Sequence, residues 1–505
     1  MRQWQIAAYR LLRNRGWWTF VAERNRTLGR VTMASNNGLQ DILDKQRAAF
    51  AASRPEPLSL RRDRIKRAMA LLTDHADVLN DAMNEDFGNR SPKQSMITDI
   101  AGTVNFGKYC LKHLDSWAKR DKRHIQFPLG LLGAKGEVRY EPKGVIGILS
   151  PWNFPVNLSF GPLMQVFAAG NRAMIKPSEF TELTSEAMRQ LAEKYFAPEE
   201  LAVVTGGPDV AHEFSSLPFD HLVFTGSTAT GRKVMQAAAE NLVPVTLELG
   251  GKSPVVLGRS ADFEKAGERI AMGKMLNAGQ ICLAPDYLYV PEEREGEAIE
   301  GLTKAASAMY PSVLDNDDYA SIVTDKHFER LQGLVSDARD KGAEVIEVNP
   351  AGEDFSNTNA RKMPLTLLRN VTDEMEAMQE EIFGPVLPIK TYGETTEAID
   401  YINRNDRPLG LYYFGSDSDE REQVLDRTIS GGVTVNDVVF HVSMEDLPFG
   451  GVGPSGIGSY HGAEGFREFS HARSVFHQTK VDVAGLAGLK PPYGEKTDKA
   501  IKKLL

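Results

Sequence analysis

Apolar residues recur with the period of an α-helix over residues 38–120. The first segment there carries a helical stripe, formed by Leu39, Ile42, Leu43, Gln46 and Phe50. Similar spacing predicts a second helix over about 59–86 and a third over about 95–119. Cys110 lies between two bulky residues on the third helix, and we interpret it as a packing residue. This pattern predicts a helical layer before the first sheet.

From Gly144 onward, short apolar runs alternate with helical segments. The runs have the length and unbroken apolar character of buried parallel strands, and they occupy 145–149, 172–175, 201–204 and 221–224. The helical segments between them lie at about 156–169, 181–195 and 230–239. A second α/β unit follows over 251–447, with apolar runs at 255–257, 287–290 and 432–436. This alternation predicts an α/β fold with two doubly wound domains.

Residues 122–142 follow neither pattern. A glycine-punctuated turn at 127–136 is flanked by two short segments, 125–126 and 137–140, that can alternate as strands. We expect a hairpin that protrudes from the α/β body. An exposed hairpin either pairs with a partner chain or carries edge charges that prevent pairing, so this segment is a candidate for oligomerisation.

Composition and charge narrow the class of protein. The 505 residues are enough for two or three domains. The net charge of −9 argues against a nucleic-acid partner. No apolar run reaches the ~18–20 residues that a membrane span needs, so we expect no membrane contact. The two cysteines exclude a disulfide scaffold and favour a reducing compartment. We therefore expect a cytoplasmic protein.

The N-terminus has an unusual composition. Seven arginines precede Met33, and Glu23 is the only acidic residue among them. An arginine-rich leader with few acids is typical of a transit peptide that directs a protein to an organelle. The other interpretation is an over-extended start, with Met33 as the true initiator. We favour the second interpretation and leave residues 1–35, an atypical extension, out of the fold prediction.

Cys282 is the first candidate for chemistry. It follows the small-residue stretch 277–281, and Glu248 lies upstream of it beside an apolar run. A thiolate can attack a carbonyl carbon, and a carboxylate can later activate a water molecule. Taken alone, a cysteine among small residues is more often an inert buried side chain. The remaining motifs decide between these interpretations.

Two further motifs follow predicted strands. Gly226 and Ser227 lie where a strand ends and a helix begins, so their backbone amides can approach a phosphate. The alternative is a tight turn without a ligand, because the string differs from the usual dinucleotide fingerprint. Lys176 and Glu179 follow another strand, at the edge where open sheets bind ligands. They can hold ribose hydroxyls or form a solvated helix cap.

Three loops complete the set of motifs. Asn153 lies between two prolines and two aromatic residues, so its amide has a preset direction of the kind that an oxyanion requires. A structural turn is the alternative. Glu381 and Phe383 can bring a carboxylate and a ring to a cofactor, or form a helix end that runs into a turn. The glycine-rich run at 448–456 is an active-site loop or a connector.

In their order along the chain, these motifs resemble those of the NAD(P)-dependent aldehyde dehydrogenase superfamily. The matching strings are Pro-Trp-Asn-Phe-Pro, Lys-Pro-Ser-Glu, Phe-Thr-Gly-Ser, Glu-Leu-Gly-Gly-Lys-Ser-Pro, Gly-Gln-x-Cys, Glu-Ile-Phe-Gly-Pro-Val and Pro-Phe-Gly-Gly, and they span roughly 40–480. The segments 280–287 and 459–466 resemble the class 3-like branch. Within that branch, the chain resembles the bacterial coniferyl-aldehyde dehydrogenases.

The resemblance implies a catalytic role for three residues. Cys282 attacks the aldehyde carbon, while the Asn153 amide and the Cys282 backbone N–H hold the resulting oxyanion. Oxidation leaves a thioester, and Glu248 activates the water that releases the carboxylic acid. The CoA-acylating relatives commonly lack a glutamate at the position of Glu248, so its presence favours hydrolysis. A catalytically silent member of the fold is a further alternative, but such members usually lose the cysteine or the glutamate.

The resemblance also implies a cofactor site and no metal. NAD is the expected cofactor, with NADP as an alternative, because a carboxylate beside the adenosine ribose repels a 2′-phosphate. The implied contacts are Lys176 and Glu179 for the adenosine ribose, Gly226 and Ser227 for the pyrophosphate, and Glu381 with Phe383 for the nicotinamide ribose. The substrate is a small-molecule aldehyde, aromatic or medium-chain aliphatic. The candidate lining residues, which are also ordinary core candidates, are Trp152, Phe154, Phe160, Met164, Phe440 and Phe449.

The resemblance divides the chain into a Rossmann-like cofactor domain, a catalytic domain and an oligomerisation element. The implied bounds are 36–121 and 143–250 for the NAD(P)-binding domain, 251–447 for the catalytic domain, and 122–142 with 470–482 for the oligomerisation element. The implied minor segments are 448–469 for the active-site loop and return segment and 483–505 for the C-terminal tail. A homodimer is the expected assembly.

Overall fold

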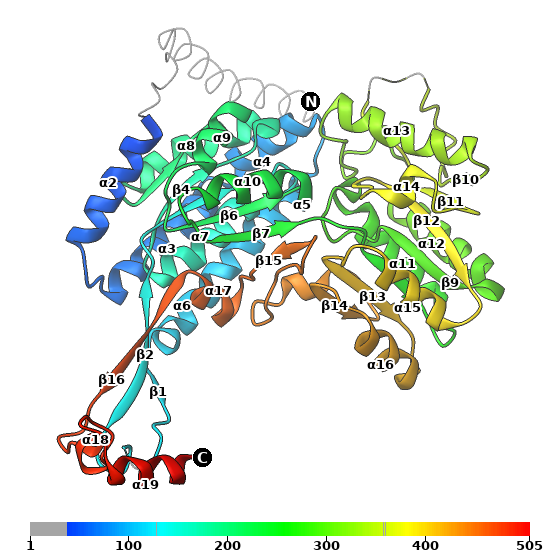
Figure 1. The fold of residues 1–505 in the computed structure, drawn as a ribbon. Helices are drawn as coiled ribbons and strands as arrows, with labels where there is room; N and C mark the ends of the chain where they lie inside the picture. The colour runs from blue at the N-terminus through cyan, green and yellow to red at the C-terminus, as the bar shows by residue number, and fades with distance from the viewer. Residues whose placement is uncertain (1–37, 128, 357, 359) are drawn as a thin grey trace.

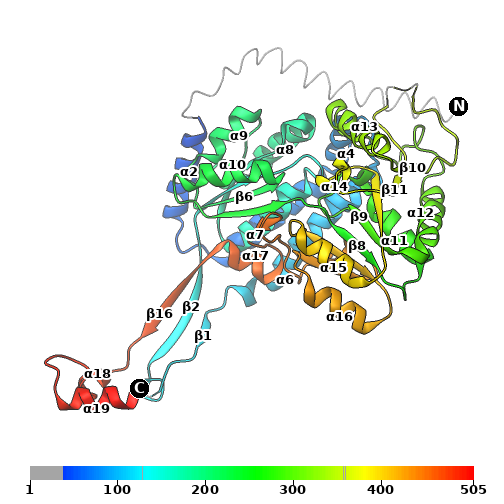
Figure 2. The ribbon, with the colours of Figure 1, turned by 45° about the vertical axis from the view of Figure 1, so that its right-hand side comes forward.

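A computed structural model describes residues 38–505, except 128, 357 and 359. The predicted N-terminal extension, residues 1–35, lies outside the described residues. The described part of the chain contains one six-stranded, one seven-stranded and one three-stranded sheet (Figure 1). The two larger sheets form the body, and the smallest projects from it (Figure 2). The α/β fold class predicted from strand–helix alternation is confirmed.

The six-stranded sheet has the strand order β15-β7-β6-β3-β4-β5. Its parallel strands are β3 (Val145–Leu149), β4 (Arg172–Lys176), β5 (Leu201–Val203), β6 (His221–Gly226) and β7 (Val245–Leu249), and β15 (Gly456–Ile457) adds an antiparallel edge. The crossover helices are α7 (Asn157–Ala169), α8 (Glu182–Tyr195), α9 (Pro208–Ser215) and α10 (Thr228–Ala239). The chain runs outward from β3 in both directions, so a switch point lies between β3 and β6, where open sheets bind ligands.

A helical layer precedes this sheet. Its elements are α2 (Gly38–Ala52), α3 (Leu58–Asp74), α4 (Ala76–Phe87), α5 (Pro92–Ser95), the π-helical turn η1 (Met96–Ala101) and α6 (Gly102–Trp117). The single helix predicted over 59–86 is wrong, because His75 leaves the helical region at φ −125° and divides it into α3 and α4. Periodicity missed the break because buried apolar residues continue on both sides of it.

The seven-stranded sheet has the order β10-β11-β12-β9-β8-β13-β14. Its strands are β8 (Pro254–Leu257), β9 (Tyr287–Pro291), β10 (Glu344–Glu347), β11 (Thr366–Arg369), β12 (Val386–Tyr392), β13 (Gly410–Phe414) and β14 (Gly432–Val435). The larger helices are α11 (Phe263–Met275), α12 (Glu295–Met309), α13 (Asp325–Asp340), α15 (Thr395–Arg404) and α16 (Ser418–Arg427), with the short α14 (Glu376–Gln379) between. Only four residues, 250–253, separate β7 of the first sheet from β8 of the second.

The three-stranded sheet forms an arm. Strand β2 (Lys135–Pro142) pairs with β1 (Asp121–Arg123) on one side and β16 (Ser470–His477) on the other, in antiparallel register. The predicted hairpin is present, but its first strand lies at 121–123 rather than 125–126, and the last strand ends at His477 rather than near 482. Helices α18 (Val483–Leu486) and α19 (Glu495–Leu504) lie at the tip of the arm, and α17 (Gly462–Glu468) lies at its base (Figure 1).

Buried side chains hold the two large sheets together. The core between the helical layer and the first sheet also contains Ile281, Leu283 and Ala284, which surround the predicted nucleophile. These residues connect α11 and β9 of the second unit, so one loop of that unit packs into the core of the first. Cys110 is fully buried in the same core, as its interpretation as a packing residue requires.

Candidate active site

The Cys282 loop has an unusual backbone. Helix α11 ends at Met275, and a turn, η3 (Leu276–Gly279), follows in which Asn277 and Ala278 both have φ of 52°. Left-handed backbone costs about 1–2 kcal/mol for each residue with a Cβ, so this conformation needs support from its surroundings. Gly279 also has a positive φ, and a Cβ there would collide with the Gly384 carbonyl. The result is a sharp turn that leaves Cys282 half-buried.

The Cys282 thiol lies close to two carboxyl groups. Burial raises its pKa well above the ordinary value, and the nearby Glu381 and Glu248 carboxyls raise it further. The thiol is therefore protonated at neutral pH and needs a base before it can act as a nucleophile. The fold therefore brings Glu248 and Glu381, both predicted from sequence, close to Cys282.

Glu248 is buried at the C-terminal end of β7, with only 2% of its surface exposed. Neither carboxyl oxygen has a hydrogen-bond partner within the described part of the chain. Burial raises the pKa of Glu248 well above its usual range, and the Glu468 carboxylate adds to the shift. A buried carboxyl without a hydrogen-bond partner is energetically unfavourable. Proteins keep such groups where catalysis needs a base whose pKa lies near neutral pH.

Asn153 lies in the loop after β3. Hydrogen bonds hold both its side-chain amide and its backbone carbonyl. Its side-chain amide donates to the Gln280 carbonyl at 3.1 Å, and its backbone carbonyl accepts from the Asn277 amide at 3.2 Å. Gln280 lies two residues before Cys282. The amide has two N–H groups, so one remains for a ligand after the Gln280 bond is made.

The predicted ribose and pyrophosphate residues lie at the ends of β4 and β6, which flank β3 in the sheet. Lys176 ends β4, and its ammonium donates to Glu179 at 3.0 Å. Gly226 ends β6, where a Cβ would come within about 2.5 Å of the Phe224 ring. Ser227 caps α10, because its hydroxyl accepts the Thr230 N–H at 3.3 Å. The α10 N-terminus therefore presents free backbone amides beside a residue that must be glycine.

Glu381 and Phe383 approach the link between the two sheets. Glu381 packs so closely over Gly250 that a Cβ there would collide with its carboxyl group. Its Oε1 has no partner in the described residues, and burial together with Asp286 raises the pKa of Glu381 to about 8. Phe383 has a φ of 54°, and its ring lies 5.4 Å from that of Trp152.

These positions form one row along the sheet. Strands β4, β3, β6 and β7 are neighbours, and their C-terminal ends carry, in that order, Lys176, Asn153, Gly226 and Glu248. The second sheet supplies Cys282 and Glu381 from the opposite side. The predicted site residues therefore lie at the C-terminal edge of the first sheet or in loops of the second unit.

Known proteins were compared with the chain. The model of the aldehyde dehydrogenase family matches residues 21–475. A probable coniferyl aldehyde dehydrogenase of Caulobacter vibrioides is 55% identical, over 90% of this chain and 94% of that protein. A coniferyl aldehyde dehydrogenase of a Pseudomonas species is 50% identical, over 92% and 96%.

Among solved structures, the substrate-bound state of Staphylococcus aureus AldH superimposes with a TM-score of 0.85 at 35% identity, covering 92% of this chain and 99% of that one. The chain belongs to the aldehyde dehydrogenase family. It is therefore an oxidoreductase that acts on aldehydes, and the resemblance drawn from its motifs is confirmed.

Several residues near the thiol of this aldehyde dehydrogenase had no assigned role in the sequence. Tyr460 is buried, and its hydroxyl interacts electrostatically with both Glu248 and Cys282. His441 and His461 both contact the Phe449 ring, at 6.5 Å and 5.3 Å between centroids. Tyr460 and His461 belong to the segment 459–466 that carries part of the family resemblance, but only the contacts of the folded chain place these side chains near the site.

The candidate substrate-lining residues divide into two groups. Phe160 and Met164 are fully buried on α7, as core residues are, whereas Trp152 and Phe154 keep partial exposure. Phe449 is buried in the cluster against which Cys282 packs. Phe440 is 46% exposed. Of the six candidates, the four outside α7 remain compatible with a substrate contact: Trp152, Phe154, Phe440 and Phe449.

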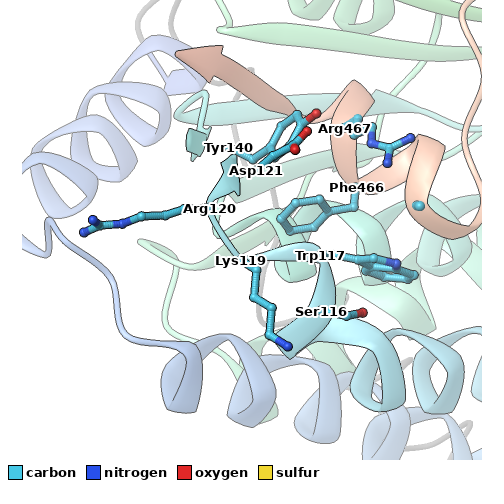
Figure 3. A pocket seen from close by; sticks show the side chains of 9 residues that line it. Ser116, Trp117, Lys119, Arg120, Asp121, Tyr140, Phe466 and Arg467 are labelled. Atoms are coloured by element: carbon cyan, nitrogen blue, oxygen red, sulfur yellow. The ribbon is translucent and has the colours of Figure 1, made fainter. Parts of the chain in front are cut away.

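A cavity of about 230 Å³ lies elsewhere in this aldehyde dehydrogenase, at the base of the arm (Figure 3). Trp117, Tyr140 and Phe466 line it together with charged side chains, and it contains none of the predicted site residues. Among the residues from 38 onward that the structure describes, no helix is long and apolar enough to cross a membrane.

The buried Glu248 carboxyl makes stability depend on pH. Unfolded, it ionises near its ordinary pKa of about 4.3, whereas the folded enzyme keeps it protonated to a higher pH. The folded state thus binds the extra proton, and stability falls as pH rises through this window. We expect Glu248→Gln to raise the melting temperature, by an amount that increases as the pH rises above the unfolded-state pKa of about 4.3. Glu300→Gln, an exposed glutamate, is the control, and an equal shift in both variants contradicts the prediction.

Proposed function

We propose that this enzyme oxidises aromatic aldehydes, coniferaldehyde in particular, to carboxylic acids with NAD. The observation that carries the mechanism is the position of Cys282, which lies in electrostatic contact with the buried, unpaired Glu248 carboxyl. Asn153 donates a hydrogen bond to the same loop. A nucleophile, a base and an amide donor therefore meet at the junction of the two sheets.

The side chains support a sequence of proton and charge movements. Loss of the thiol proton to a base gives a Cys282 thiolate, which attacks the aldehyde carbon and forms a carbon–sulfur bond. The former carbonyl oxygen becomes an oxyanion, which the second N–H of the Asn153 amide and the Cys282 backbone N–H stabilise. After oxidation the acyl group remains on sulfur as a thioester. Ionised Glu248 then removes a proton from water, the water oxygen attacks the acyl carbon, and the thiolate leaves.

The residues of the first sheet fit a nicotinamide dinucleotide, which supplies the hydride acceptor when it is bound. Gly226 and the α10 N-terminus suit a pyrophosphate, because a Cβ at position 226 would meet the Phe224 ring. The Lys176–Glu179 pair suits ribose hydroxyls, and the partly exposed Glu179 carboxylate disfavours a 2′-phosphate. The unpartnered Glu381 oxygen suits the second ribose.

Three features support an aromatic substrate. Two relatives at 50–55% identity are named for coniferyl aldehyde. The Tyr460 hydroxyl interacts with Cys282, and the Tyr460 ring packs edge to face on that of Phe449 with centroids 5.9 Å apart, which suits stacking against a planar substrate. His441 and His461 each keep one ring nitrogen without a partner in the described chain, and burial lowers their pKa values to about 4 and about 3. Neutral imidazoles in this position can bind the ring oxygens of a phenolic aldehyde.

The thiol and the carboxyl have separable roles. Cys282→Ala is expected to abolish NADH formation, because no thioester can form. Glu248→Gln is expected to lower steady-state turnover by about 10²–10⁴-fold, as loss of a general base does, while a pre-steady-state burst of NADH remains. Stopped-flow absorbance at the NADH band measures both quantities.

Four outcomes of NADH assays on these variants and the wild type contradict the assignment. Near-wild-type turnover of Cys282→Ala excludes the nucleophile. Loss of burst and turnover together in Glu248→Gln excludes a role confined to hydrolysis. Turnover of the wild type that requires CoA identifies a CoA-acylating enzyme instead, and no signal with a broad set of aldehydes identifies a silent member of the fold.

Substrate preference is tested by comparing kcat/KM for coniferaldehyde, cinnamaldehyde and hexanal, each with NAD and with NADP. We expect coniferaldehyde with NAD to give the highest value. Cinnamaldehyde lacks the ring oxygens and is expected to fall by about 10-fold or more, since an unsatisfied buried polar group costs about 1–3 kcal/mol. A preference for hexanal would contradict the aromatic assignment and leave the mechanism intact.

We further propose that the arm joins two copies of the chain into a homodimer. It projects from the body (Figure 2), and β16 is an edge strand. Apolar side chains along the arm are largely exposed: Phe127, Leu131, Phe476, Leu486 and Tyr493. Exposed apolar surface joined to an open strand edge favours association with a second chain.

Sedimentation velocity tests the dimer. We expect the wild type to sediment at about twice the 55.8 kDa of one chain, and Phe127→Glu combined with Leu131→Glu to shift the equilibrium toward monomer by about 10-fold or more. Leu242→Glu is the matched control, because Leu242 is equally exposed on the body. A monomeric wild type, or equal behaviour of the two variants, contradicts the proposal.

The remaining assignments rest on the same features. We propose that residues 36–121 with 143–250 form the cofactor domain and 251–447 the catalytic domain, in keeping with the two large sheets. Limited proteolysis at the 250–253 link tests this division. We propose a cytoplasmic location, which suits the free thiols Cys110 and Cys282. Cell fractionation tests it.

A further inference from the structure

The segment 90–99 contacts both loops that carry the proposed chemistry. It lies in the helical layer, about 55 residues before Asn153 and 185 before Cys282 along the chain, and it includes the π-helical turn η1. Single π-turns inside helices occur often at functional sites. The hydrogen bonds of Gln94 and Asp99 show what this segment does.

Gln94 is buried and binds Asn277 with both of its polar atoms. Its Oε1 accepts the Asn277 backbone N–H at 3.1 Å, and its Nε2 donates to the Asn277 Oδ1 at 3.2 Å. The Asn277 amide is thereby oriented with its NH₂ group toward Asn153 and Gln280, whose carbonyls accept at 3.2 Å and 3.3 Å. The Gln280 carbonyl is the same one that accepts from the Asn153 amide.

These contacts support the strained part of the Cys282 loop. Asn277 is the first of the two residues with left-handed backbone, and its N–H would otherwise be buried without a partner. An Asn277 amide turned by 180° would present oxygen to two carbonyl oxygens, which is repulsive. Gln94 disfavours that orientation, because its Nε2 requires an acceptor at Oδ1.

Asp99 fixes the opposite side of the Asn153 loop. Its Oδ1 accepts the backbone N–H groups of Val156 and Asn157 at 3.2 Å and 3.1 Å, at the start of α7. Its Oδ2 is paired with Arg90 at 2.7 Å, and both side chains are fully buried. The loop between β3 and α7 is thus held at its end by Asp99 and in its middle by Asn277, which Gln94 orients.

We propose that Gln94 is a positioning residue for catalysis. It acts through Asn277 to set the Asn153 amide and the Cys282 loop relative to each other, at the distance that oxyanion stabilisation requires. The inference rests on the proposed roles of Asn153 and Cys282. Gln94 touches neither reacting group. Its loss is therefore expected to slow the chemical step, which kcat reports, and to leave the binding of the dinucleotide unchanged.

The test compares Gln94→Ala with Gln46→Ala. Gln46 is also buried, and its amide donates to the Ala173 and Pro198 carbonyls at 2.9 Å and 2.8 Å, away from the site. Both variants lose two buried hydrogen bonds, so both are expected to melt at a lower temperature. Gln94→Ala is expected to lower kcat by about 10–10²-fold with the KM for NAD within about twofold, whereas Gln46→Ala keeps kcat within about twofold.

A double-mutant cycle separates positioning from general destabilisation. Once Asn153→Ala has removed the side-chain oxyanion donor, Gln94→Ala is expected to lower kcat by less than about threefold further, because the amide that Gln94 sets against the Cys282 loop is absent. Hydrolysis of p-nitrophenyl acetate, which acylates the same thiol without a cofactor, is expected to follow the same pattern. Gln94→Glu keeps the acceptor for the Asn277 N–H but loses the donor, so its kcat should lie between wild type and Gln94→Ala.

The outcomes are distinguishable. If Cys282→Ala and Asn153→Ala lose activity while Gln94→Ala behaves like Gln46→Ala, or if the Gln94 and Asn153 effects simply multiply, the positioning role is wrong and the proposed function stands. If Cys282→Ala or Asn153→Ala retains activity, the proposed function itself fails. A rise in the KM for NAD that matches the fall in kcat also overturns the positioning role.

Discussion

The two large sheets must meet in one fixed arrangement, because the proposed reacting groups come from both of them. Asn153 and Glu248 belong to the six-stranded sheet, and Cys282 belongs to a loop of the seven-stranded unit. Four residues connect β7 to β8, and the apolar residues around Cys282 pack into the core of the first sheet. Apolar packing sets the approach of the sheets, but it is not directional. Hydrogen bonds among Gln94, Asn277, Asn153 and Gln280 supply the direction.

The same junction concentrates groups that a stable fold would avoid. Glu248 and one oxygen of Glu381 are buried without partners in the described chain, and two residues before Gly279 adopt left-handed backbone. Each feature is unfavourable by itself. They occur together where thiol chemistry needs a base, a restricted loop and little competing water, so the strain is confined to a small region. The Lys176–Glu179 pair at the end of β4 is, by contrast, satisfied by its own hydrogen bond.

Sequence reasoning was accurate where a signal is local. Strand–helix alternation identified the sheets, and Lys176, Asn153, Gly226 and Glu248 could be placed because each follows or ends an apolar strand. Helix boundaries were less certain, since the stripe of α3 continues into α4 across the break at His75. Gln94 could not be found in this way. Its partner Asn277 is 183 residues distant, and one glutamine on a helix has no distinguishing pattern. Tyr460 belongs to a segment that carried the family resemblance, but its approach to Glu248 and Cys282 depends on contacts that are distant in sequence.

The arrangement also explains how specificity and chemistry can vary independently in this enzyme. The dinucleotide candidates Lys176, Gly226 and Ser227 lie on strands of one sheet, whereas the rings of His441 and Phe449 come from the segment that follows β14. His441 and Phe449 lie outside the parallel strands that carry the dinucleotide candidates, although β15, further along the same segment, pairs with β7 at Glu248. Changes in the ring environment can therefore alter which aldehyde is accepted while the row at the sheet edge stays in place. The proposed chemistry depends on neither group of residues alone. The helical layer orients the Cys282 loop, and this layer binds neither proposed ligand.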